Sequence, residues 1–164
     1  MSVFHYFTPM FKKRISIFEI EEGNLLSPKF NNKGLIPVVT TNYKTGDVLM
    51  HGYMNREALM KTIETKEAHY WSRSRKSLWH KGKTSGFVQK VVEMRIDDDQ
   101  DAVWMKVNIG KGASCHVGFI SCFYRSITLG KTKNFKKIKI KFKEKNKKFD
   151  PDKVYKGQPN PTKL

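Results

Sequence analysis

The chain has 164 residues, of which 38% are hydrophobic and 12% aromatic, so it can bury a core and is not a disordered polymer. No run approaches the roughly 18 apolar residues of a membrane helix, and two cysteines are too few for a disulfide scaffold. The net charge of +17 comes mainly from lysine, and it predicts only a general attraction to polyanions. The basic residues of the N-terminus follow the apolar ones, the reverse of a secretory signal, so we expect a cytoplasmic protein.

The first predicted elements form a β-hairpin and a helix. Two apolar runs, residues 35–41 and 48–54, flank the turn sequence Lys-Thr-Gly-Asp and predict the hairpin. Asn55 is typical of a helix N-cap, and the pattern after it predicts a helix to about residue 66. Residues 68–72 then return to the composition of a strand.

Two longer strands are predicted downstream of a polar stretch. Residues 87–96 and 102–109 both alternate between apolar and polar side chains. In the first strand, the alternation places Val92 on one face with Met94 and Ile96.

These elements organise the chain into three parts. Residues 1–33 form an irregular N-terminal extension, residues 34–125 form the folded domain, and residues 126–164 form a lysine-rich tail with one strand at 138–142. One helix and five or six strands indicate an α+β fold, a β-rich single domain with one main helix.

Three polar segments are candidates for chemistry. The first, residues 71–86, reads WSRSRKSLWHKGKTSG and combines arginines, lysines, hydroxyls and glycines. Phosphate oxygens are bound by such charged donors and by exposed backbone N–H groups. A basic solvated loop has the same composition, so both readings stay open.

The second segment, residues 97–101, holds four carboxylates between two apolar strands. On an extended chain Asp97, Asp99 and Asp101 point to one side and Asp98 to the other. Convergent carboxylates repel one another unless a hard cation such as Mg²⁺ neutralises them. The alternative is an acidic hairpin turn without a metal ion.

The third segment contains Cys115, His116 and Cys122. Two thiolates with a neighbouring base could bind Zn²⁺ and assist a proton transfer. The alternative is a pair of small buried residues beside a hydrogen-bonded histidine.

Together and in this order, the segments resemble those of the phosphoribosyl-AMP cyclohydrolases, enzymes of histidine biosynthesis. The resemblance runs from about residue 30 to residue 125 and includes M-N-x-E-A-L at 54–59 and C-H-x-G-x-x-S-C-F-Y at 115–124. It also includes the W-S-R-S-R-x-x-L-W-x-K-G-x-T-S-G block and the acidic cluster. The resemblance implies a cytoplasmic, intertwined homodimer with metal sites at the subunit interface.

The resemblance also implies an activity and a set of site residues. The reaction is the hydrolytic opening of the adenine ring of phosphoribosyl-AMP, at the N1–C6 bond, by metal-activated water. The implied residues are Asp97, Asp99 and Asp101 for Mg²⁺, Cys115, Cys122 and Asp98 for Zn²⁺, His116 for proton transfer, and Arg73, Arg75, Lys81, Thr84 and Ser85 for the phosphate and ribose groups.

The sequence departs from the family pattern at two places. Asp98 stands where the family usually has a third cysteine ligand, and Phe119-Ile120 stand where it more often has basic residues. An aspartate offers a hard oxygen in place of a soft sulfur, so this site should accept Fe²⁺ or Mn²⁺ more readily than a site with three thiolates. The alternative is that the metal site is lost.

Two other functions stay open on the sequence alone. A catalytically silent relative would keep the fold without turnover. A basic nucleic-acid-binding module would explain the charge but not the acidic cluster, which repels phosphate. We therefore expect a small-molecule substrate and no specific nucleic-acid or membrane partner.

Overall fold

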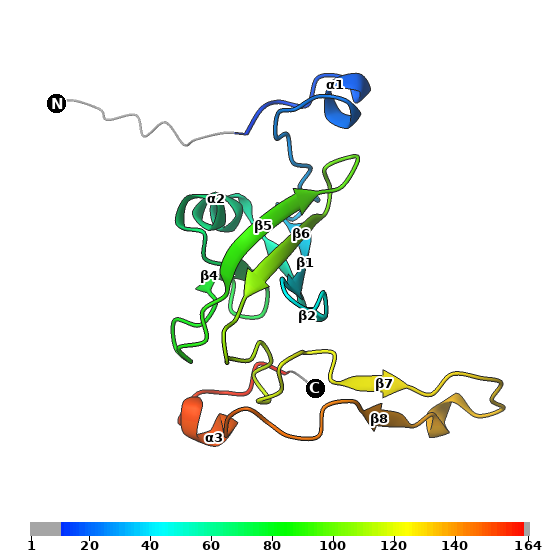
Figure 1. Cartoon of the computed structure of the whole chain (residues 1–164). Helices are drawn as coiled ribbons and strands as arrows, with labels where there is room; N and C mark the ends of the chain where they lie inside the picture. The colour runs from blue at the N-terminus through cyan, green and yellow to red at the C-terminus, as the bar shows by residue number, and fades with distance from the viewer. Residues whose placement is uncertain (1–10, 163–164) are drawn as a thin grey trace.

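A four-stranded sheet forms the centre of the molecule (Figure 1). The computed structural model describes residues 11–162. The sheet has the order β2-β1-β6-β5, in which β1 is antiparallel to β2 and parallel to β6, and β5 is antiparallel to β6. These strands are β1 (Ile36–Asn42), β2 (Val48–Met54), β5 (Lys90–Ile96) and β6 (Val103–Asn108). The β-rich α+β fold predicted from the sequence is confirmed.

The predicted hairpin and helix are also confirmed. Gly46 has a φ of +78° in the β1–β2 turn, a left-handed conformation that glycine adopts without steric cost. The Asn55 side chain accepts a hydrogen bond from the N–H of Ala58 at 2.8 Å and begins α2 (Arg56–Thr65). Lys66 ends the helix in the left-handed conformation.

A small second sheet pairs β3 (His69–Ser72) with β4 (Ser77–His80). The sequence predicted β3 but missed β4, because polar and basic neighbours hide a strand whose Leu78 and Trp79 pack on the core. Within this sheet, the buried hydroxyl of Tyr70 lies 2.7 Å from Thr40 Oγ1 and donates to Gln89 Oε1 at 2.7 Å. These bonds tie the small sheet to the main one.

One core joins the main sheet to α2 and β3. Its fully buried apolar side chains include those of Ile36, Val38, Leu49, Met54, Leu59, Met105 and Val107. The alternation predicted for β6 is confirmed, since Val103, Met105 and Val107 are all buried. The prediction for β5 was wrong at Val92, which is 58% exposed. The register shifts beside Val92, and this β-bulge turns Val91 toward the core instead.

The two ends of the chain carry further elements. A short helix, α1 (Ile17–Glu21), lies in the extension that was expected to be irregular. In the tail, β7 (Arg125–Ile127) and β8 (Ile140–Phe142) pair as an antiparallel hairpin. The short helix η1 (Phe135–Lys137) lies in the connection between these two strands, and α3 (Pro151–Val154) follows β8. The predicted tail strand is therefore present but two residues shorter. We call residues 125–142 the arm; it projects from the end of the molecule opposite α1 (Figure 1).

Two further observations bear on function. Tail residue Phe142 packs its ring against Phe119 and Tyr124, which form a second small core with Cys115. Among residues 11–162, no helix combines the length and the apolar content that crossing a membrane requires.

Candidate metal and phosphate site

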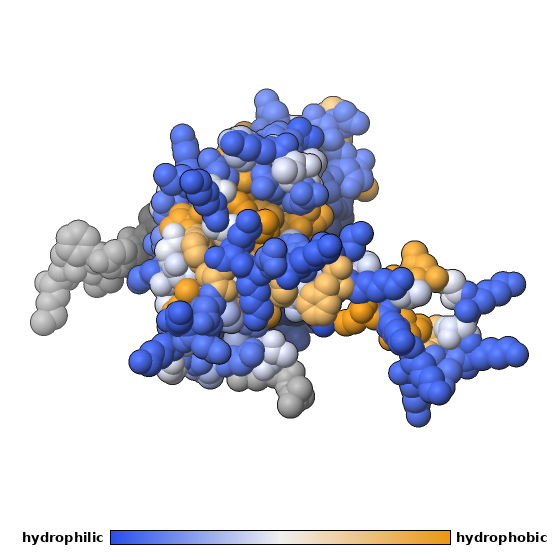
Figure 2. Space-filling model, turned by 60° about the horizontal axis from the view of Figure 1, so that its bottom comes forward, coloured by the Kyte–Doolittle hydropathy of each residue, from blue (hydrophilic) through white to orange (hydrophobic). Residues whose placement is uncertain are grey.

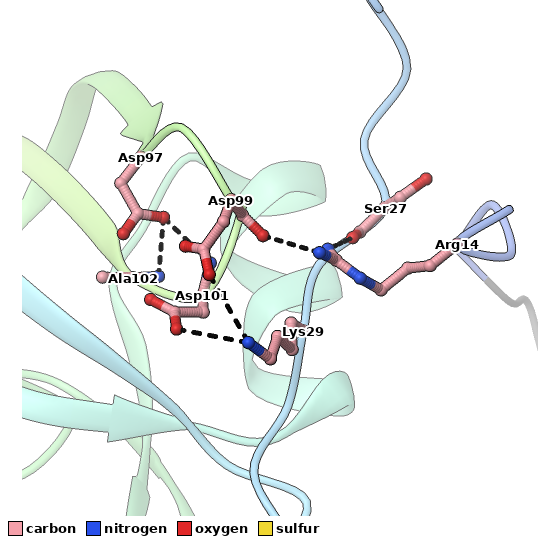
Figure 3. A network of polar contacts seen from close by, with 7 residues as sticks. All are labelled: Arg14, Ser27, Lys29, Asp97, Asp99, Asp101 and Ala102. Atoms are coloured by element: carbon pink, nitrogen blue, oxygen red, sulfur yellow. Dashed lines mark hydrogen bonds and ion pairs between the residues drawn. The ribbon is translucent and has the colours of Figure 1, made fainter. Parts of the chain in front are cut away.

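The acidic segment forms a tight turn between β5 and β6 (Figure 3). Asp97 Oδ1 accepts hydrogen bonds from the backbone N–H groups of Asp101 and Ala102, at 2.8 and 2.9 Å. One oxygen each from Asp97, Asp99 and Asp101 lie within 4.8 Å of one another. The convergence predicted from the sequence is present, but the turn produces it rather than strand alternation. Asp98 is exposed and lies outside this group.

A lysine from the N-terminal extension partly neutralises the turn. Lys29 Nζ lies 3.4 Å from Asp99 Oδ2 and 3.8 Å from Asp101 Oδ2. Desolvation, followed by the charges of Asp99 and Asp97, raises the pKa of Asp101 above its ordinary value. Three carboxylate oxygens with an excess of negative charge are a donor set that suits a hard divalent cation.

The turn is braced by buried polar contacts with the same extension. Gln100 sits at a φ of +59° and is almost fully buried. Its Oε1 accepts from the N–H of Ser27 at 2.7 Å, and its Nε2 donates to the carbonyl of Ile20 at 3.1 Å. Arg14 donates to the carbonyls of Ser27 and Asp99, at 2.6 and 2.8 Å. The sequence does not predict these hydrogen bonds, because most of them join residues that lie far apart in the chain.

The two cysteines meet in a loop that follows β6. The Ser114 N–H donates to Ile120 O at 2.9 Å, and the Cys115 N–H donates to Phe119 O at 3.2 Å. The thiols of Cys115 and Cys122 lie close enough for each to shift the pKa of the other. The predicted pair is therefore brought together.

This arrangement favours one thiolate. The Cys122 thiol, then the Val117 N–H and the Lys81 ammonium, lower the pKa of Cys115 to about 6. The Cys115 thiol and burial raise the pKa of Cys122. Lys81 is buried, and its Nζ donates to Ser114 O at 2.6 Å. Burial lowers the pKa of Lys81. Thiolate is the form of cysteine that binds metals.

His116 is half-buried beside this pair. Burial, with a smaller effect of the Lys81 charge, lowers the pKa of His116 below its ordinary value. Its Nε2 is buried and has no hydrogen-bond partner among the described residues. A neutral imidazole with a free ring nitrogen can accept a proton.

The tail also supports this loop. The carboxylate of Glu144 accepts hydrogen bonds from the N–H groups of Ile120 and Ser121, at 2.7 and 2.9 Å. The sequence predicts only a lysine-rich tail with one strand here, so it does not identify Glu144.

The predicted phosphate residues fall into two groups. Arg73 and Arg75 are exposed on the β3–β4 turn, where their guanidinium groups lie over the rings of Tyr53 and Trp79, at 4.2 and 5.5 Å. The Lys81 ammonium lies 4.8 Å from the centre of the same Trp79 ring as Arg75, and it also bonds Ser114 of the cysteine loop.

The remaining pair, Thr84 and Ser85, lies in the turn before β5. Thr84 is exposed, whereas Ser85 Oγ accepts a hydrogen bond from the N–H of Phe87 at 3.2 Å.

The acidic turn and the cysteine loop lie at opposite ends of β6. The turn precedes Val103 and the loop follows Asn108. Six strand residues span about 20 Å. In one chain, therefore, the structure does not bring Asp98 to the cysteines.

The fold and these clusters define a small β-rich protein with one donor set suited to a hard cation and another suited to a soft one. The family model described as phosphoribosyl-AMP cyclohydrolase matches residues 50–124. A protein of that name from Rhodopseudomonas palustris is 57% identical over 84% of this chain and 89% of its own length. Those from Bradyrhizobium diazoefficiens and Nitrobacter winogradskyi are 53% and 51% identical, over 84% and 85% of this chain and 95% and 94% of their own lengths. The chain belongs to the phosphoribosyl-AMP cyclohydrolase family and is a hydrolase.

Proposed function

We propose that this chain hydrolyses the N1–C6 bond of the adenine ring of phosphoribosyl-AMP, in the histidine biosynthetic pathway. One observation carries the proposal: the family match over residues 50–124 includes every predicted catalytic, metal and substrate residue. Water adds at C6, and the N1–C6 bond then breaks to open the six-membered ring. The substrate carries two phosphates, which we assign to Arg73, Arg75, Lys81, Thr84 and Ser85.

The two donor sets would hold different metal ions. We assign Mg²⁺ to Asp97, Asp99 and Asp101, whose oxygens already converge within 4.8 Å. We assign Zn²⁺ to Cys115 and Cys122, because each thiol shifts the pKa of the other and the pKa of Cys115 is lowered. A bound zinc ion would make a water molecule acidic enough to act as a nucleophile near neutral pH.

The third zinc ligand, Asp98, comes from a second chain in this proposal. The length of β6 separates Asp98 from the cysteines of its own chain by about 20 Å. A homodimer that places the acidic turn of one chain against the cysteine loop of the other completes the ligand set. Such sharing makes each site depend on both chains.

Two residues beside the thiols would then accept a proton and stabilise the thiolate charge. His116 is the proposed proton acceptor, because its pKa is lowered and its Nε2 is free of partners among the described residues. Lys81 supports the thiolate of Cys115 from its buried position.

Asp98 sets the metal preference of the shared site. Because its oxygen is harder than a thiolate sulfur, we expect the Asp98→Cys variant to bind Zn²⁺ more tightly than the wild type. Equilibrium competition with a chromophoric chelator measures this affinity without any substrate. Unchanged zinc affinity in the variant would contradict a ligand role for Asp98.

The experiment that tests the function is turnover of phosphoribosyl-AMP by metal-stripped protein. Mg²⁺ is present throughout, and Zn²⁺, Mn²⁺ or Fe²⁺ is added back singly. Ring opening that one of these ions restores supports the cyclohydrolase and identifies the ion that Asp98 accepts. Folded protein that shows no turnover with any ion would indicate a catalytically silent relative.

We also propose a cytoplasmic location. Support comes from the two free cysteines, which persist in a reducing compartment. The chain binds its small-molecule substrate and has no specific nucleic-acid partner in this proposal.

A further inference from the structure

The arm carries an exposed apolar surface that the proposed chemistry does not use. Its apolar side chains are those of Ile127, Leu129, Phe135, Ile138, Ile140 and Phe142, and all are exposed. Leu129 is 90% exposed and Phe135 78%. Figure 2 shows this apolar surface on the arm that projects from the body, with hydrophilic side chains around it. Large apolar side chains left exposed together on one projecting element indicate an interaction site.

The charge of the arm has one sign. Residues 125–142 contain one arginine and six lysines but no acidic residue. A partner for this surface therefore needs apolar side chains together with negative charge.

The segment around α1 has that chemistry. Residues 15–25 contain three glutamates and no basic residue. Glu19 already pairs with Lys12 at 3.2 Å, so the exposed Glu21 and Glu22 supply the negative charge offered to a partner. Ile17 and Phe18 are 75% and 74% exposed, and Ile15 and Leu25 are exposed as well. A cavity of about 290 Å³ lies beside these side chains and is lined by Ile15, Ile17, Ile20, Glu21 and Asp99, together with Arg14 and Ser16. Its apolar wall and carboxylate edge suit an apolar side chain flanked by lysines.

These two surfaces cannot meet within one chain. Figure 1 places α1 at one end of the molecule and the arm at the other. They can meet between two copies, because a two-fold dimer pairs each α1 with the arm of its partner. We propose that the arm of one chain docks on the α1 surface of a second copy.

This docking deepens the proposed homodimer and rests on it. The cavity includes Asp99 of the acidic turn, and the arm begins three residues after Cys122. A dimer that joins the turn of one chain to the cysteine loop of the other therefore brings α1 toward the partner's arm. A polyanion would use only the lysines, and it would leave the apolar side chains of the arm and the α1 surface without a role.

The test is a charge exchange on the full-length chain, with the dimer dissociation constant measured by sedimentation velocity. The α1 variant is Glu21→Lys/Glu22→Lys, and the arm variant is Lys136→Glu/Lys137→Glu. Each variant places like charges at both symmetric contacts, so we expect its dissociation constant to rise about tenfold or more. An equimolar mixture pairs opposite charges again, and heterodimers should form with an affinity near that of the wild type.

A matched control keeps the test independent of folding. Lys33→Glu/Lys44→Glu changes the net charge as the arm variant does, at exposed turns, and should dimerise as the wild type does. The docking is overturned if the α1 and arm variants dimerise normally, or if their mixture shows no recovery. A wild-type dimer that dissociates on addition of a nucleic acid would also overturn it, in favour of a polyanion. Turnover of phosphoribosyl-AMP by the wild type is measured in parallel, so a failure of the docking stays distinct from a failure of the proposed activity.

Discussion

At the scale of single residues, Lys29 acts as an internal counter-ion of the acidic turn. Its ammonium group lies within 4 Å of both Asp99 and Asp101, where it competes with an added cation. We predict that Lys29→Gln tightens Mn²⁺ binding by about two- to fivefold at low salt, which is the strength of an exposed ion pair.

Isothermal titration calorimetry measures this affinity without any substrate. Lys33→Gln, which changes an exposed lysine of a nearby turn, should leave Mn²⁺ binding unchanged. Weaker or equal binding by the Lys29 variant would show that the lysine does not compete with the cation.

Another single residue, His69, makes stability depend on pH. Burial, and then the charge of His80, lower the pKa of His69 below its ordinary value, and the rings of the two histidines stack at 4.4 Å. The folded state therefore favours the neutral form of His69. The contribution of His69 to folding stability is fully present above pH 6.5 and is lost as the pH falls through its lowered pKa.

We predict that urea unfolding shows a smaller loss of stability between pH 7.5 and pH 5 in His69→Gln than in the wild type. The conservative change keeps a polar side chain that can hydrogen-bond to the Glu67 carbonyl, as His69 Nδ1 does at 2.8 Å. Equal pH slopes for the two proteins would exclude His69 as the titrating group.

At the scale of elements, the tail holds the cysteine loop in shape through Glu144. Replacing this residue by alanine leaves the N–H groups of Ile120 and Ser121 without their acceptor. We predict that Glu144→Ala lowers the free energy of unfolding by about 1–3 kcal/mol. Glu144→Gln removes the charge but keeps an acceptor oxygen, so its free energy of unfolding should fall clearly less than that of Glu144→Ala.

Urea denaturation measures both changes, and the reaction of the buried Cys115 with a thiol reagent reports on opening of the loop. The alanine variant should react faster than the glutamine variant. Identical behaviour of the two variants would mean that charge, rather than hydrogen bonding, accounts for the role of Glu144.

The elements that sequence reasoning predicted are those with strong local signals. The β1–β2 turn has Gly46, α2 has the Asn55 cap, and β6 has regular alternation. The elements it missed depend on distant partners. The β4 strand has few apolar side chains of its own, and the bulge at Val92 arises only from pairing with β6.

The same distinction holds for the candidate site. Residue types identified Asp97, Asp99 and Asp101 as a cluster, because their spacing is local. Residue types did not identify Arg14, which reaches Asp99 across 85 positions of sequence. Contacts between distant segments leave no pattern that a single sequence shows.

At the scale of the whole molecule, one geometric fact governs the proposed chemistry. The acidic turn and the cysteine loop lie at opposite ends of β6, so a site that uses both requires two chains. The positively charged arm and the negatively charged α1 segment likewise lie at opposite ends of the molecule. A two-fold dimer would satisfy both pairings at once, which links the lysine-rich tail to the assembly of the site.

The most direct test of this shared site is complementation between two inactive variants. Asp98→Ala and Cys115→Ala are each expected to abolish turnover of phosphoribosyl-AMP. In a heterodimer of the two, one of the two sites takes Asp98 and both cysteines from intact positions. Co-expressed variants should therefore recover about a quarter of the wild-type activity, since half of the dimers are mixed and each holds one intact site. Purified heterodimer with no activity above that of the single variants would contradict a site shared between chains.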